Sequence, residues 1–487
     1  MASKETGEAL PEEPTIIGAR RSVGDDSKES VRMLESLPTG KVLGDDAAAT
    51  AGAQPGEGEY HTRWIYFAKF AWGACFGRFM SLYYLAEGLD EAEIGAVFAI
   101  GTALGPLIST GVGILADRLA VRVASARHLY FAGCVLLGTV TFTLQAIRIP
   151  GVSRFSVMLG CRVLLAGCSS SGDVLVDAIT VRCLRDRRRF GKERLYGAVS
   201  WAIMHMLLGM LIDRFGMVVL HVGIILNAAM TFVILLRVGV PPLTTEESGS
   251  PSKGARGLAA LADKAALRAL LASYCSSGLI LAFFVYSFTL GIGMTLVENL
   301  IFLLFRELNA SYVLCGLSVV VTVVFEIPLF AVSDRLLARV GAPGLLAAAG
   351  LCYSFRVVGY TLSPGGWYIL LFEPMHGVTI ATSSTASVEM VASITPPALA
   401  ATGQALFGLV RSSLGSTTGN LVGGAVIRHF GESACYRSSA LIVMAGLAVY
   451  KAALLRQDRR PGRADLEELP SKGAAGDEEV DERLEGS

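Results

Sequence analysis

Twelve stretches of this sequence are apolar enough and long enough to cross a lipid bilayer as helices. A hydrocarbon core of about 30 Å requires roughly 20 apolar residues in helical conformation. Only 17% of the residues are charged, compared with about 25% in soluble domains. Because peptide groups must find their hydrogen bonds inside each segment in lipid, we expect an all-α membrane protein. The expected spans are 64–85, 94–116, 128–147, 155–179, 195–212, 218–238, 278–305, 313–332, 345–362, 367–391, 400–427 and 440–455.

The spans form two sets of six, separated by a polar segment that contains Pro241-Pro242 and Ser248-Gly249-Ser250-Pro251. Composition of this kind is typical of a linker rather than of a folded domain. We therefore predict an N-terminal six-helix bundle over 63–238, a cytoplasmic linker over 239–270 and a C-terminal six-helix bundle over 271–455.

The two ends of the chain are polar, and we predict disordered cytoplasmic tails over 1–62 and 456–487. The first 60 residues hold twelve Asp and Glu against six Lys and Arg and lack the apolar run of a cleaved signal peptide. Arginines crowd the loops after the second and fourth spans, so the positive-inside rule places both termini in the cytoplasm. The sequence does not indicate which membrane holds the protein. Its zero net charge carries no information about a nucleic-acid partner, and we expect none.

A short basic stretch occurs twice, after the second span of each set. Residues Asp117 to Val123 and Asp334 to Val340 are identical at five of seven positions. Such a repeat is expected from a parallel duplication of six helices. Two basic loops that merely obey the positive-inside rule would explain the arginines but not the matched Asp and its spacing.

The first copy, with its preceding glycine, resembles the signature loop of the major facilitator superfamily. The resemblance implies twelve transmembrane helices in two six-helix bundles that rock around a site at mid-membrane, with the loop acid locking one conformation. The second copy departs from the pattern because Phe330 stands where the glycine is expected. The residues of this conformational loop are Gly113, Asp117, Arg118, Arg122, Asp334, Arg335 and Arg339.

Charged side chains within the spans are the candidate functional residues of this chain. A charge at the centre of a span costs about 2.5–3.5 kcal/mol on insertion scales, so it usually marks a substrate or proton pathway. The other interpretation is an ion pair that holds two helices together. Arg78, Arg162, Arg411 and Glu389 match no pattern, and packing is the default interpretation for them.

In the N-terminal half, the stretch from Phe190 to Trp201 resembles the lactose-permease-like branch of the superfamily. The resemblance implies that Arg194 and Trp201 bind substrate, with Asp177 as the partner of Arg194 after a one-residue offset. An arginine fork can bind hydroxyl groups or a carboxylate, and an indole face packs on a sugar ring or a base. Alternatively, Arg194 is one more loop arginine and Trp201 is a packing residue. Asp173 lies one turn before Asp177 and shares its helix face.

The C-terminal half carries a denser set, in the order acid, acid, arginine, histidine. The residues around this set resemble those of the same branch, which includes the eukaryotic major facilitator superfamily domain-containing protein six group. The resemblance implies that Glu298 and Glu326 bind substrate and that Arg356 and His376 take part in proton coupling. The pattern departs next to His376, because the acid stands one turn before it, at Glu373, rather than one turn after it. We expect Glu373 to carry the proton by exchanging an ionised for an apolar environment.

These observations predict a secondary transporter for a small polar solute, namely a sugar, oligosaccharide or nucleoside, coupled to H⁺ and acting as a monomer in the lipid bilayer. An organic-ion or drug exchanger is one alternative, and a non-transporting membrane receptor or scaffold is another. We find no nucleotide-binding loop, metal cluster or nucleophile constellation, so the sequence predicts neither an enzyme nor a cofactor.

Overall fold

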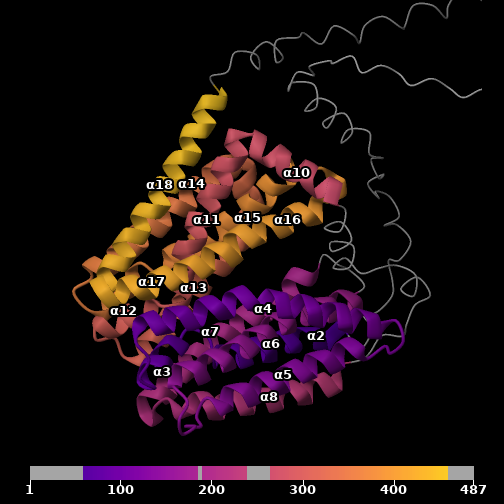
Figure 1. Cartoon of the computed structure of the whole chain (residues 1–487), viewed down its shortest axis with the longest axis vertical. Coiled ribbons are helices and arrows are strands. Elements are labelled where there is room, and N and C mark those ends of the chain that lie inside the picture. Colours follow the sequence, from indigo (N-terminus) through magenta and orange to yellow (C-terminus); the bar gives the residue numbers. More distant parts are fainter. Residues whose placement is uncertain (1–58, 185–188, 239–263, 459–487) are drawn as a thin grey trace, which may run out of the picture.

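The computed structural model describes residues 59–184, 189–238 and 264–458, and every regular element in these ranges is a helix (Figure 1). The N-terminal half comprises α2 (Glu59–Ala74), α3 (Met80–Ala86), α4 (Glu91–Ala120), α5 (Ala126–Leu144), α6 (Arg154–Cys183), α7 (Phe190–Phe215) and α8 (Val218–Arg237). The C-terminal half comprises α10 (Lys264–Ser276), α11 (Gly278–Asn299), α12 (Ile301–Glu307), α13 (Tyr312–Ala331), α14 (Ser333–Leu362), η2 (Gly366–Leu371), α15 (Pro374–Ile394), η3 (Pro397–Leu399), α16 (Ala400–Gly408), η4 (Leu409–Gly415), α17 (Ser416–Phe430) and α18 (Glu432–Asp458).

The expected all-α membrane architecture is confirmed. Within the described ranges, nine helices are long and apolar enough to cross a membrane. The expected spans 64–85, 367–391 and 400–427 instead coincide with interrupted helices: α2 with α3, η2 with α15, and α16 with η4 and α17. The predicted tails and most of the predicted linker lie outside the described residues, although the last part of the linker forms the start of α10.

The first span of each half is broken within its length. In the N-terminal half, α2 ends at Ala74 and α3 begins at Met80, with turns and a bend between them. In the C-terminal half, α11 ends at Asn299 and α12 begins after Leu300. Irregular backbone at membrane depth is tolerated only where it is buried in protein or lines a cavity. The two breaks therefore mark positions where a binding site can be built.

Two further irregularities interrupt helices of the C-terminal half. The segment η4 is a π-helix between α16 and α17, and such segments frequently occur at functional sites. In α14, Gly341 adopts a positive φ of 71° and separates the residues of the second basic repeat from the expected ninth span. The repeat and the span are thus two helical pieces joined at a glycine that tolerates this conformation.

The two halves form separate bundles that contact each other through α4 with α17 and through α7 with α13 (Figure 1). A Cβ atom on Gly424 would lie 2.4 Å from the carbonyl oxygen of Glu91, so only glycine allows α17 this close to α4. On the other side, the Asp213 carboxylate of α7 accepts hydrogen bonds from the backbone N–H groups of Tyr312 (3.1 Å) and Val313 (2.9 Å). A carboxylate at this place stabilises the N-terminus of α13.

These contacts share one end of the molecule, which we call the closed end. It carries the loops 87–90, 216–217, 308–311 and the residue Gly431. Asp90 and Arg428 form an ion pair of 2.8 Å between the halves at the same end. The first basic repeat lies at the opposite end of α4, and the second lies at the start of α14, directly after α13; both are away from these contacts. The structure is therefore a conformation in which the halves are joined at one membrane surface.

Candidate functional site

An ion pair between the two broken helices forms the centre of the candidate site. Arg78 lies in the break between α2 and α3, and Glu298 lies in the last turn of α11, next to the second break. The Arg78 guanidinium donates to both oxygens of Glu298, at 3.0 and 3.3 Å. Only 3% of the Arg78 side chain is exposed, whereas 38% of the Glu298 side chain is. This bidentate pair joins the two halves, and Glu298 remains partly accessible.

His376 of α15 lies between Glu298 and a second arginine. Its Nε2 atom is 3.0 Å from Glu298, and its Nδ1 atom contacts the guanidinium of Arg356. A guanidinium can only donate hydrogen bonds, so Nδ1 must be the acceptor. Nε2 then carries the hydrogen and donates it to Glu298. In this tautomer the neutral imidazole bridges Arg356 and Glu298, and its Nε2 atom also lies 3.4 Å from the Arg78 guanidinium.

Glu373 is held in place by donors from three directions. The hydroxyl of Tyr360 donates to one oxygen and the hydroxyl of Thr322 to the other, both at 2.7 Å. Arg356 lies 3.7 Å away and also contacts Tyr360. All these groups are buried. Two O–H donors and a nearby arginine thus surround the Glu373 carboxylate.

We call the residues of this connected set the central network: Arg78, Glu298, Thr322, Arg356, Tyr360, Glu373 and His376. Two arginines balance two glutamates and the histidine is neutral, so the network carries no net charge. The attraction within the pairs and the additional hydrogen bonds offset the cost of removing these charges from water. The sequence predicts five functional residues in the C-terminal half. Four of them, Glu298, Arg356, Glu373 and His376, belong to this network, and Glu326 does not.

Glu326 lies beside the central network but is not bonded into it. It is half-buried on α13, where its backbone packs against Gly377 of α15. It is within electrostatic reach of Glu298 and Arg78. Within the described ranges its carboxylate has no hydrogen bond or ion pair. Glu326 is therefore available for a ligand or a proton in this conformation.

Trp201 lies against the break that carries Arg78. A Cβ atom on Gly77 would lie 2.7 Å from its indole ring, so the glycine lets the ring approach the backbone of the break. The ring is half-buried and packs on His205, with ring centroids 4.3 Å apart. Trp201 thus adjoins the central network from the N-terminal half.

Asp177 and Arg194 belong to a different cluster. They line a small cavity of about 20 Å³ together with Tyr66, Lys69 and Asp173. Tyr66 donates to Asp177 at 2.7 Å, and Lys69 contacts Asp173. Seven helical residues separate Arg194 from Trp201, a rise of about 10 Å. The structure therefore does not gather Asp177 and Arg194 with Trp201 and Glu298, although the sequence pattern groups them.

The other singled-out residues lie away from the central network. Asp117 accepts from Arg127 at 3.1 and 3.2 Å within its own half. Arg411 donates to Ser383 at 2.8 Å from the π-helix η4, and Arg162 lies over the ring of Phe98. Gly113 is half-buried. The remaining loop residues and one acid of α15 are exposed: Arg118, Arg122, Asp334, Arg335, Arg339 and Glu389.

Three residues of the central network have no functional role in the sequence prediction. Arg78 was expected to be a packing residue, and Tyr360 and Thr322 carry no charge that would single them out. One signal was available for Arg78: the C-terminal set has three acids but only one arginine, so a further cation was required. No group of three or more His, Cys, Asp or Glu suited to a metal occurs in the described part of the chain.

Comparisons with known proteins agree with this architecture. The model of the MFS_1-like family matches residues 61–438. The nucleoside transporter NupG superposes with a TM-score of 0.66 at 15% identity, covering 81% of this chain and 98% of that one. A peptide transporter POT in complex with alafosfalin gives 0.58 at 16%, covering 89% and 99%. A bacterial homolog of the human lysosomal transporter Spinster, inward-facing and unoccupied, gives 0.56 at 13%, covering 82% and 96%.

The structural likenesses establish the fold, and the family match covers most of the chain. The spans, the internal repeat and the two-bundle arrangement all agree with them. This chain therefore belongs to the MFS_1-like family and is an integral, multi-pass membrane protein with the major facilitator fold.

Proposed function

We propose that the protein is a proton-coupled secondary transporter of a small polar solute, a sugar, oligosaccharide or nucleoside. The observation that carries the proposal is the Arg78–Glu298 pair, which joins the two halves at the breaks of their first spans. Broken helices near mid-membrane supply the polar groups of transporter sites. The other contacts between the halves lie at the closed end. A ligand that binds between the halves could therefore interact directly with this charged pair.

The position of the contacts supports alternating access. The halves meet at the closed end through Asp213, Asp90 and Arg428, and the basic repeats lie at the other end. The positive-inside rule assigns those repeats to the cytoplasm. This conformation is then open toward the cytoplasm, and the opposite conformation requires the closed-end contacts to part.

The chemistry of the site favours an uncharged, hydroxyl-bearing solute. The central network is neutral as a whole, which supports an uncharged solute, and Glu326 beside it is an acid without an ion pair in the described part of the chain. Arg78 and Glu298 can share donors and acceptors with hydroxyl groups, and Glu326 adds an unbonded acceptor. The indole of Trp201 beside Arg78 supplies an apolar face for a sugar ring or a base. We assign substrate contact to these four residues, and a supporting role to Asp177 and Arg194.

Proton coupling is assigned to Glu373, His376 and Arg356. In this conformation Glu373 accepts hydrogen bonds from Tyr360 and Thr322 and lies 3.7 Å from Arg356. A change of conformation that withdraws these donors leaves a buried carboxylate, which binds a proton. His376 connects that event to Glu298, and through it to Arg78 in the other half. Protonation at Glu373 and solute binding at Glu298 are then coupled through one chain of contacts.

The test is uptake by proteoliposomes with an inside-alkaline pH gradient, screened with labelled sugars and nucleosides. We expect wild-type protein to accumulate one of these solutes. Glu373→Gln should abolish gradient-driven accumulation but retain exchange of solute at equal concentrations. The matched control is Glu389→Gln, an exposed acid on the same helix, which should behave as wild type.

Two outcomes would overturn parts of the proposal. Accumulation that survives Glu373→Gln would refute the proton assignment. A folded, monodisperse protein that moves none of the solutes would instead favour the receptor or scaffold alternative. Uptake of organic cations alone would favour the exchanger.

A further inference from the structure

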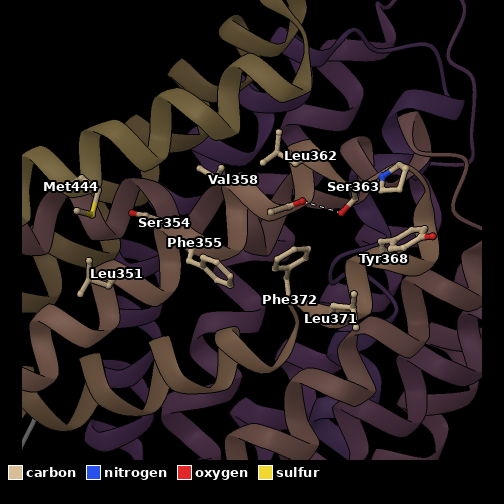
Figure 2. A pocket seen from close by; sticks show the side chains of 12 residues that line it. Leu351, Ser354, Phe355, Val358, Leu362, Ser363, Tyr368, Leu371, Phe372 and Met444 are labelled. Atoms are coloured by element: carbon tan, nitrogen blue, oxygen red, sulfur yellow. Dashed lines mark hydrogen bonds between the residues drawn. The ribbon is translucent and has the colours of Figure 1, made fainter.

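A large apolar groove lies on the outer surface of the C-terminal half (Figure 2). Its volume is about 610 Å³, within the range of small-molecule sites. One wall is a stripe of α14 that includes Leu351, Val358 and Leu362, and Met444 of α18 forms the other. Phe372, after η2, closes the groove from the side, with its ring turned toward Phe355. None of these elements lies between the two halves, so the groove is separate from the central network.

The groove follows about three turns of α14. Leu351 and Leu362 are eleven residues apart on one helix, a distance of about 16 Å. The lining is almost wholly apolar, and the Ser363 hydroxyl donates its hydrogen bond to the Gly359 carbonyl at 2.9 Å. Apart from Tyr368, the lining side chains thus offer van der Waals contact rather than polar recognition. Such a lining suits a hydrocarbon chain from the surrounding bilayer.

A cation stands at one end of the groove. Arg437 lies two turns before Met444 on α18, so the two side chains share a face. Its exposed guanidinium donates to the side chain and carbonyl of Thr361, next to Leu362, at 3.0 and 3.3 Å. Five N–H donors are available on an arginine, so donors remain for a phosphate. Tyr368, which lines the groove, and its sequence neighbour Trp367 are both exposed, as interfacial aromatic residues are.

We propose that this groove binds one phospholipid, with an acyl chain along α14 and the phosphate on Arg437. The arrangement matches a lipid at both ends: hydrocarbon contact at membrane depth and an arginine at the level of the interfacial aromatics. A concave site of this kind holds a lipid longer than a flat helix surface does, because more of the chain is in contact with protein.

The bound chain would also touch a residue adjacent to the central network. Phe372 lines the groove and precedes Glu373 in sequence, and its ring packs on Tyr360 with centroids 6.1 Å apart. Tyr360 donates to Glu373 from the same side. An occupied groove therefore restrains Phe372 and stabilises the contacts of Glu373 in this conformation.

Native mass spectrometry of the delipidated full chain, titrated with phosphatidylglycerol, tests the proposal. We expect one lipid to bind more tightly than the rest. Val358→Trp fills the groove and should weaken this first site at least tenfold. Leu226→Trp, an exposed apolar position on α8 of the other half, should leave it unchanged. Arg437→Gln should weaken it by roughly tenfold, the loss of one hydrogen bond to a charged group.

Diacylglycerol, which lacks the phosphate, separates the two parts of the site. Wild-type protein should bind it more weakly than phosphatidylglycerol, and Arg437→Gln should bind both equally. Equal first-site affinity in wild type, Val358→Trp and Leu226→Trp would overturn the groove as the site. An Arg437→Gln variant that binds phosphatidylglycerol as tightly as wild type would overturn the placement of the phosphate. Melting temperatures with and without lipid verify that each variant is folded.

Discussion

Loss of either member of the Arg78–Glu298 pair should destabilise the protein, and loss of both should restore much of the stability. The pair is bidentate, at 3.0 and 3.3 Å, and joins the two halves. Removing one partner from a fully buried pair costs about 3–5 kcal/mol, and an exposed pair is worth only about 0.2–1 kcal/mol. Arg78 is 3% exposed but Glu298 is 38% exposed. We therefore expect an intermediate loss of about 2 kcal/mol for Arg78→Gln or Glu298→Gln.

The design is a double-mutant cycle on purified protein in one detergent. Apparent melting temperatures of wild type, both single variants and Arg78→Gln/Glu298→Gln give the coupling between the two side chains. The double variant should be more stable than the sum of the single effects predicts, because it leaves no unpaired charge at the breaks. Arg148→Gln, at a side chain that is 80% exposed, is the control and should change little.

Additive effects of the two single variants would refute the reasoning, because they would mean that the pair is not formed in the protein. Arg78→Lys sharpens the test. A lysine keeps the charge but cannot donate in the bidentate geometry of a guanidinium. We expect it to recover only part of the loss, and full recovery would show that charge alone is required.

Three further predictions concern the closed end and the buried acid. Gly424→Ala should shift the protein away from the closed-end conformation, because its Cβ atom would lie 2.4 Å from the Glu91 carbonyl oxygen; distances between bioorthogonal labels on the two halves at that end should lengthen. Asp213→Ala removes the carboxylate that caps α13 and should destabilise the closed end by about 0.5–2 kcal/mol, seen as faster hydrogen exchange at the start of α13. Tyr360→Phe removes one donor to Glu373 and should cost about 1–3 kcal/mol, lowering the melting temperature; an unchanged melting temperature would contradict the hydrogen bond.

The sequence is sufficient to predict the membrane fold because apolar length is a local property. Each expected span either meets the length and hydropathy of a membrane helix or coincides with an interrupted one. The breaks themselves are not visible in hydropathy, since 64–85 and 278–305 stay apolar through them. Gly77 and the adjoining charge are the only local marks of the first break.

The site could be predicted only in part, because some residues that contact each other in it are far apart in the sequence. Glu298, Arg356, Glu373 and His376 were expected to act together, and the structure places them in one network. The partner of Glu298 in the other half is 220 residues away, and nothing local in the sequence pairs it with Arg78. Asp177 and Arg194 were grouped with Trp201 by resemblance, although helical rise alone separates Arg194 from Trp201 by about 10 Å.

The central claim is that solute and proton move together, and proton flux measured with solute entry tests it most directly. Proteoliposomes containing a pH-sensitive dye would be given the transported solute without an imposed pH gradient. The account predicts that solute entry acidifies the lumen with wild-type protein and with Glu389→Gln, and that Glu373→Gln admits solute without acidification. Labelled solute that enters through wild-type protein while the luminal pH stays constant would contradict it.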